Sequence, residues 1–113
     1  MDIKNCKVTI YIPATIGIDK LIDNSEYVKR AALLLCQCFG GATESQRARY
    51  WVSDTAGLVK ENTTTISSYC TKQEFDRYIK GISKYCKRLR KIMRQDCIAL
   101  EISENVGVMH FIK

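Results

Sequence analysis

The sequence predicts a two-layer α+β domain in which two helices cover one face of a mainly antiparallel sheet. Two segments, residues 26–39 and 72–94, place apolar residues at helical spacing. The segments before, between and after them are rich in β-branched residues or alternate apolar and polar residues, as strands do. A chain of 113 residues fits one core and not two. We therefore expect residues 1–113 to form a single domain.

The first strand and the first helix follow each other closely. Residues 7–12 alternate with a period of two, and Pro13 ends this predicted strand. After a connection over residues 14–22, Asp23-Asn24-Ser25-Glu26 offers several N-cap residues, with Glu26 three positions after Asp23. The helical pattern continues to Phe39. Gly40-Gly41 then supplies a left-handed stop, so the helix should end there.

A hairpin and a long second helix come next. Residues 43–52 and 58–69 are predicted strands, joined by a turn at Asp54-Thr55-Ala56-Gly57. Thr71-Lys72-Gln73-Glu74 has the S/T-x-x-E pattern of a capping box and should start the second helix. That helix should span about 23 residues, or roughly 34 Å. Its predicted apolar stripe runs from Phe75 to Met93 and includes Ile92.

Two short strands complete the chain, at residues 98–102 and 108–112, around a turn at residues 104–107. The order is then β-α-β-β-α-β with one extra C-terminal strand. This order predicts a ferredoxin-like sandwich. Domains of this kind often pair through the open face or the edge of the sheet. Arg49 and Trp51, on one face of the second strand, would suit a homodimer.

The second helix concentrates the positive charge of the protein. Residues 72–94 include nine basic and two acidic residues, a net charge of +7, whereas the whole chain carries +6. One interpretation is an ordinary solvated helix face whose cations complement the helix dipole. The other is an electrostatic surface for RNA, DNA or an acidic protein. We prefer the second and predict as its binding residues Arg77, Lys80, Lys84, Lys87, Arg88, Lys91 and Arg94.

The sequence offers little for catalysis or metal binding. The six cysteines include no C-x-x-C pair and His110 is the only histidine, so we expect free thiols, no metal site and no cofactor. Gly40-Gly41 follows a helix and lacks the context of a phosphate-binding loop. Glu61 and the Ser53-Asp54 pair are compatible with acid–base chemistry but lie in ordinary strand and turn positions. We therefore expect no catalytic residues.

No segment predicts export or a membrane span. The N-terminal residues lack an uninterrupted apolar stretch. The longest apolar run, residues 31–36, is far shorter than the roughly 20 residues of a transmembrane helix. A cytoplasmic protein without a membrane partner is expected.

Three segments of the helix-to-hairpin region resemble small ferredoxin-like proteins of phages, plasmids and integrated elements. They are Phe39 to Thr43, then Tyr50-Trp51, then Gly57 to Asn62. Among such proteins the chain looks like an anti-CRISPR protein that acts on a single-protein (type II) effector. The resemblance implies a non-enzymatic inhibitor from a mobile genetic element. Its basic helix would engage the guide RNA or an acidic patch of the effector ribonucleoprotein.

Two other functions remain open. One is a dimeric α/β-barrel enzyme that binds a small molecule in a large apolar pocket between helices and sheet. In that case a polar group such as His110 or Tyr50 would converge on the pocket. The other is a general nucleic-acid-binding regulator.

Overall fold

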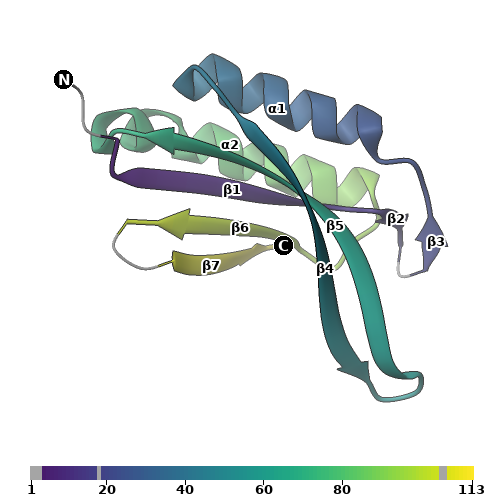
Figure 1. Ribbon diagram of the computed structural model, residues 1–113. Helices are drawn as coiled ribbons and strands as arrows, with labels where there is room; N and C mark the ends of the chain where they lie inside the picture. Colours follow the sequence, from purple (N-terminus) through teal and green to yellow (C-terminus); the bar gives the residue numbers. More distant parts are fainter. Residues whose placement is uncertain (1–3, 18, 105–106) are drawn as a thin grey trace.

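A five-stranded antiparallel sheet, a small two-stranded sheet and two helices make up the fold of the computed structural model, which describes residues 4–17, 19–104 and 107–113. The elements are β1 (Cys6–Pro13), β2 (Thr15–Ile16), β3 (Lys20–Leu21), α1 (Ser25–Phe39), β4 (Thr43–Ser53), β5 (Gly57–Cys70), α2 (Lys72–Ile92), β6 (Ile98–Ser103) and β7 (Gly107–Ile112). The sheet order is β4-β5-β1-β6-β7. Both helices lie on one face of this sheet (Figure 1). The predicted α+β sandwich is confirmed, and the strand order is consistent with a ferredoxin-like fold.

Local sequence signals set most of the element ends. The Thr71 hydroxyl accepts a hydrogen bond from the Glu74 amide, and the Glu74 carboxylate accepts one from the Thr71 amide, so the predicted capping box is present. Gly40 ends α1 with φ 92°, and Gly57 closes the hairpin turn with φ 72°. Both conformations are easy only for glycine. At the start of α1 the N-cap residue is Asn24, and its side chain makes no capping bond.

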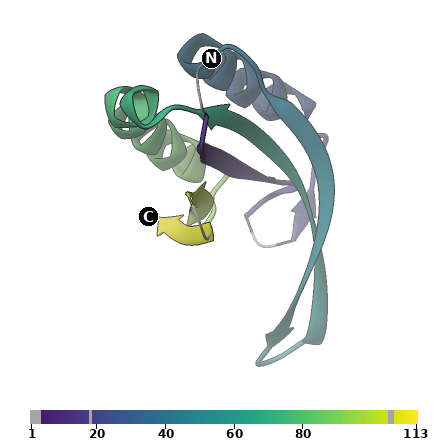
Figure 2. The ribbon, with the colours of Figure 1, turned by 60° about the vertical axis from the view of Figure 1, so that its left-hand side comes forward.

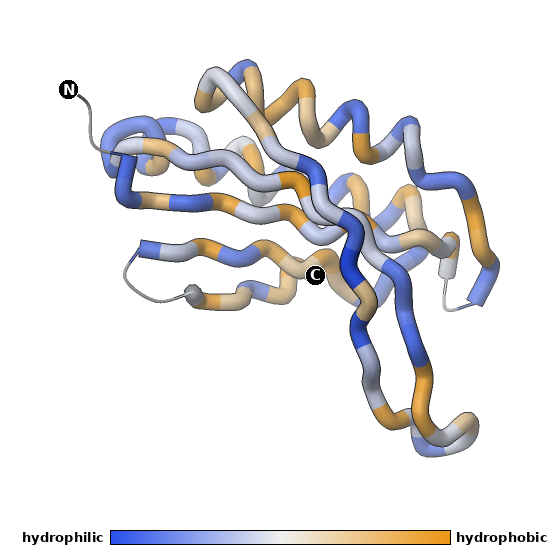
Figure 3. Tube along the Cα trace, in the orientation of Figure 1, coloured by the Kyte–Doolittle hydropathy of each residue, from blue (hydrophilic) through white to orange (hydrophobic). Residues whose placement is uncertain are grey.

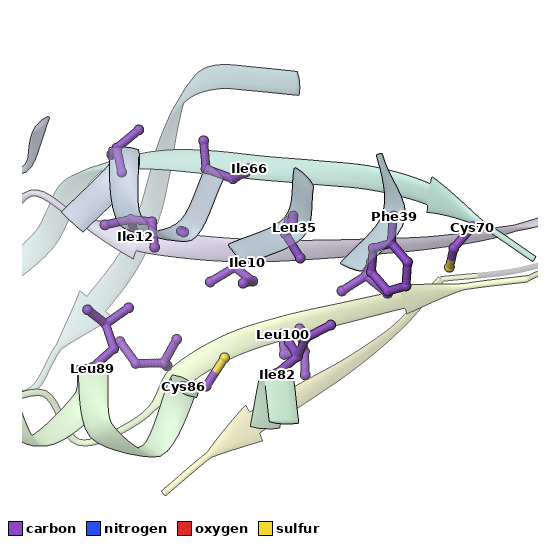
Figure 4. Close-up of a cluster of buried hydrophobic side chains, with 14 of the residues drawn as sticks. Ile10, Ile12, Leu35, Phe39, Ile66, Cys70, Ile82, Cys86, Leu89 and Leu100 are labelled. Carbon is purple, nitrogen blue, oxygen red and sulfur yellow. The ribbon is translucent and has the colours of Figure 1, made fainter. Parts of the chain in front are cut away.

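The core lies between the helices and the sheet. Ile10 and Ile12 of β1 and Leu100 of β6 point towards the helices, where Leu35 of α1 and Ile82 of α2 meet them (Figure 4). These side chains are almost completely buried. Close packing of this layer, rather than intrinsic helix preference, holds the two amphipathic helices in place.

The hairpin formed by β4 and β5 extends well beyond the rest of the sheet. Strand β1 pairs with β5 only as far as Thr63, whereas β4 and β5 pair with each other down to Ser53 and Gly57. The far half of the hairpin is therefore a two-stranded arm that projects from the body (Figure 2). Apolar segments remain near the tip of this arm (Figure 3), although no third element covers them.

Some elements differ from the sequence-based expectation. The connection after β1 contains the small β2–β3 hairpin, which was not predicted because each strand has only two residues. Ile92 is 55% exposed, so this member of the predicted stripe lies outside the core, whereas its neighbours Leu89 and Met93 are buried. Residues 105–106 of the predicted last turn lie outside the described residues. No helix among the described residues has the length and hydropathy to cross a membrane.

Candidate functional site

Six of the seven predicted binding residues lie on α2 and the seventh, Arg94, lies just beyond its end; we call this set the α2 ridge. All seven side chains are exposed. None of them forms an ion pair with a carboxylate among the described residues. The prediction that this cationic row faces solvent is thus confirmed by the geometry. Its role is a separate question, because exposure alone identifies no partner. The ridge residues are Arg77, Lys80, Lys84, Lys87, Arg88, Lys91 and Arg94.

The structure brings a different set of polar side chains together on the sheet face that no helix covers, which we call the open face. Because side chains alternate along a strand, residues next to the core positions of β1 point to this face. Thr9 of β1 pairs with Ser67 of β5 on one side and with Glu101 of β6 on the other. The Thr9 and Ser67 hydroxyls are 2.8 Å apart. The middle of the open face is therefore polar and hydrogen-bonded.

Tyr11 and Glu101 form the central contact of the open face. The Tyr11 hydroxyl donates a hydrogen bond of 2.8 Å to Oε1 of Glu101, and both side chains are half-buried. Burial raises the pKa of Tyr11, the hydrogen bond to Glu101 raises it further, and the nearby Arg47 and Arg49 partly offset the rise. Tyr11 is therefore a neutral hydrogen-bond donor at neutral pH, and Glu101 offers a partly desolvated carboxylate.

The β4–β5 arm adds charged and aromatic side chains to the same face. Arg49 contacts Glu61 on the neighbouring strand at 3.3 Å (Nη2 to Oε2). Trp51 lies two residues further along β4, so it projects from the same side. At the other end of β1 and β5, away from the arm, Nζ of Lys7 lies 5.3 Å from the ring centre of Tyr69. The open face thus combines guanidinium, carboxylate and aromatic groups.

The enzyme alternative required a large apolar pocket between the helices and the sheet, and the described residues contain none there, because the core side chains fill that space. His110 lies exposed on β7, and Tyr50 is 58% exposed on the arm, so the two do not converge. The larger described hollow, about 360 Å³, is shallow and lies at the C-terminal end of α1 around Gly40 and Gly41.

The cysteines are free thiols, and burial makes the inner ones unreactive. Burial raises the pKa of Cys86 to about 12 and that of Cys70 to about 11. A thiol with so high a pKa is almost entirely protonated at neutral pH and is a poor nucleophile. Among the described residues no cluster of three or more potential ligands could hold a metal ion.

Comparison with solved structures gives two close matches in fold. A phage SAM lyase in complex with S-methyl-5'-thioadenosine superposes with a TM-score of 0.68 at 18% identity, over 97% of this chain and 90% of that chain. A phage SAM lyase in the apo state superposes with a TM-score of 0.67 at 19% identity, over 96% of this chain and 89% of that chain. No family model matches the sequence, and no curated protein matches it.

These matches correct the functional interpretation of the sequence. The resemblance to phage proteins is supported, because both structural neighbours are phage proteins. The prediction of a non-enzymatic anti-CRISPR inhibitor is wrong, since both neighbours are an enzyme and one of them holds a small ligand. Nothing in the structure or the comparisons supports a CRISPR effector as partner. The error arose because the charge of α2 dominates the sequence, whereas an enzyme site depends on a few side chains that only the folded sheet assembles.

The residues of the open face were only partly visible in the sequence. The alternation of β4 placed Arg47, Arg49 and Trp51 on one face, and the register confirms this. Tyr11 and Glu101 are 90 positions apart, and nothing in the sequence indicates that they meet. Correct pairing of β1 with β6 would have been needed to find them.

Proposed function

We propose that the protein is an enzyme that cleaves S-adenosylmethionine (SAM) and releases S-methyl-5'-thioadenosine. The observation that carries this proposal is the likeness in fold to a phage SAM lyase, which spans 97% of this chain and 90% of the other and includes a form with that nucleoside bound.

The chemistry of SAM defines what the site must do. The substrate carries a carboxylate, an ammonium group and a sulfonium cation. When the bond between the sulfonium sulfur and the carbon chain of the amino-acid part breaks, sulfur keeps the bonding electron pair and leaves as a neutral thioether. The carbon accepts an electron pair from the carboxylate of the same molecule, so a C–O bond replaces the C–S bond and the amino-acid part closes to a lactone. The leaving group therefore needs no proton from the enzyme. The main task of the protein is to hold the amino-acid part and the nucleoside in one reactive orientation.

The open face can supply these contacts. We assign Glu101 to the cationic part of SAM, because it is a half-buried carboxylate with one hydrogen bond from Tyr11. Arg47 lies close enough to influence Tyr11 and is an exposed guanidinium without an ion pair among the described residues, so it suits the carboxylate of SAM. Trp51, 41% exposed on the arm, offers an aromatic surface for the adenine ring.

The direct test is an incubation of the purified protein with SAM at neutral pH, followed by liquid chromatography of the nucleosides. We expect S-methyl-5'-thioadenosine to form with multiple turnovers, well above a protein-free control that measures the spontaneous breakdown of SAM. Formation of S-adenosylhomocysteine instead would indicate methyl transfer and contradict the proposal. So would a rate equal to that of the control.

We also propose that the chain self-associates through the β4–β5 arm, as expected from Trp51. Val52 and Leu58 face each other across the hairpin and are 77% and 69% exposed. Large apolar side chains exposed together usually mark an interface. Val52 and Leu58 project from the side of the arm opposite Trp51, so a second copy is the simplest partner that would cover this apolar side of the arm.

The double substitution Val52→Ser and Leu58→Ser is expected to convert an oligomer into a monomer of 12.9 kDa. Light scattering coupled to size-exclusion chromatography measures this mass directly. Serine replacements at the exposed Leu21 and Leu33, away from the arm, are the control and should leave the oligomer intact. A wild-type protein that is already monomeric at micromolar concentration would contradict the proposed association.

A further inference from the structure

The α2 ridge has no part in the proposed SAM site. The ridge belongs to the helical layer, whereas the open face is the side of the sheet that the helices do not cover (Figure 1). Any role of the ridge is therefore independent of SAM cleavage and needs a ligand of its own.

Among the residues that the structure describes, no carboxylate pairs with the cations of the ridge. Only two acidic residues lie on α2, and both are engaged at its first turns: Glu74 caps the backbone at Thr71, and Asp76 pairs with Lys72 at 3.3 Å. From Arg77 to Arg94 the sequence contains no acidic residue. Like charges three and four residues apart repel each other in a helix. The repulsion between these cations therefore destabilises the helix.

The helix dipole does not account for this pattern. Its favourable effect on cations is confined to the last turn of a helix. On α2 only Arg90 and Lys91 occupy that turn. Arg77, Lys80 and Lys84 lie more than one turn before it, where the dipole contributes little.

A glycine within the ridge provides a second, independent observation. Gly81 lies inside α2 next to Lys80, and one turn from Arg77 and Lys84. It is exposed, and a β-carbon added there would meet no atom within 4 Å. Packing therefore does not require glycine, although glycine disfavours a helix interior. Its effect is to leave a gap among three cations, where the backbone is open to the close approach of an anionic group.

The spacing of the ridge fits a regular polyanion. Within α2, Arg77, Lys80, Lys84, Lys87 and Lys91 recur at steps of three or four positions, so these five charges lie about 4.5–6 Å apart along the axis and cover roughly 21 Å. A nucleic acid duplex carries one negative charge per about 1.7 Å of its axis and can meet the whole row. A membrane surface fits less well, because an interfacial helix keeps its apolar side free to enter the lipid. The apolar side of α2, including Ile82 and Leu89, is buried in the core.

We propose that the α2 ridge, with the gap at Gly81, binds the phosphate backbone of a nucleic acid without reading its base sequence. The flexible lysines suit phosphates, and the ring of Tyr78, which lies beside Arg77, is half-buried rather than presented to stack on bases.

Fluorescence anisotropy with a labelled 20-base-pair DNA duplex and a 20-nucleotide RNA tests the proposal. Binding should weaken steeply with salt, with a log–log slope of about −4.5 for the duplex and about −3.5 for the single-stranded RNA if five phosphates are contacted. Replacing Lys80, Lys84, Lys87 and Lys91 with glutamine should lower the affinity at least about 100-fold at low salt and remove most of the slope. A matched variant with glutamine at Lys20, Lys29, Lys60 and Lys113 changes the net charge equally and should lose much less.

Gly81→Ala adds a sharper test, because it keeps every charge. We expect it to raise the melting temperature and to weaken nucleic-acid binding several-fold, since the added methyl group fills the gap. Equal losses of affinity in the two glutamine variants would show that binding depends only on the net charge of the protein, and would overturn the proposal. Absence of binding at 50 mM salt, or binding to anionic phosphatidylserine vesicles but to neither nucleic acid, would also overturn it. None of these outcomes depends on whether the protein cleaves SAM.

Discussion

Truncation of Leu35 to alanine is expected to lower the free energy of unfolding by about 2–5 kcal/mol. Leu35 lies on α1, is completely buried, and contacts the layer between the helices and β1 (Figure 4). The substitution removes apolar contact and leaves a cavity that the rigid sheet below cannot fill. Since domains of this size are stable by only about 5–15 kcal/mol, the variant should lose a large share of its stability. Urea denaturation followed by circular dichroism measures the change.

Leu33→Ala is the matched control, because it makes the same substitution two residues away on the same helix. The Leu33 side chain is 60% exposed, so little contact is lost and alanine even has a better helix preference. Its free energy of unfolding should change by less than about 0.5 kcal/mol. Similar losses for the two variants would show that α1 is not packed on the sheet in the orientation described.

Glu101→Gln is expected to lower kcat/KM for SAM cleavage by about 10–100-fold, which corresponds to roughly 1.4–2.7 kcal/mol of lost transition-state stabilisation. The substitution keeps the size of the side chain and its acceptor for the Tyr11 hydroxyl, but removes the charge that we assign to the cationic part of SAM. Because the substrate loses its sulfonium charge in the reaction, the carboxylate acts mainly in binding and orientation. The effect should therefore appear largely as a higher KM.

Glu44→Gln is the control for this prediction. Glu44 pairs with Ile66 in the register of β4 and β5, so it points to the helix side of the same sheet. Its replacement should leave kcat/KM unchanged within twofold. If Glu101→Gln folds normally and keeps wild-type activity, the open face is not the site of the reaction. The proposed activity would then require a site elsewhere on the molecule.

The local elements could be predicted well because their signals are local. The capping box of Thr71 and Glu74 and the left-handed Gly40 and Gly57 act within a few residues, so the sequence reveals them directly. The start of α1 was less clear, since several N-cap residues follow one another and the structure uses Asn24 without a side-chain bond. The small β2–β3 hairpin has too few residues to show any periodicity.

The function was harder to predict than the fold. Charge is visible in a sequence without any knowledge of three-dimensional contacts, and this drew the functional prediction to α2. The likeness to a phage SAM lyase is a likeness of the whole fold. The two sequences are only 18% identical, and we recognised no short motif that would have indicated it. The Arg49 and Glu61 ion pair on the arm could have been suspected, since both residues were noted, but only the register brings them to 3.3 Å.

Taken by itself, the sequence determined that two amphipathic helices must cover one face of an antiparallel sheet, because their apolar stripes have no other surface to meet. It also determined that the cations of the α2 ridge face solvent, since the opposite stripe is buried. Only the tertiary structure decided that Tyr11 and Glu101 meet on the open face, and that the β4–β5 hairpin projects beyond the sheet. The reason is that strand pairing joins residues far apart in the chain, and the alternation of side chains specifies a face but not the neighbour across it.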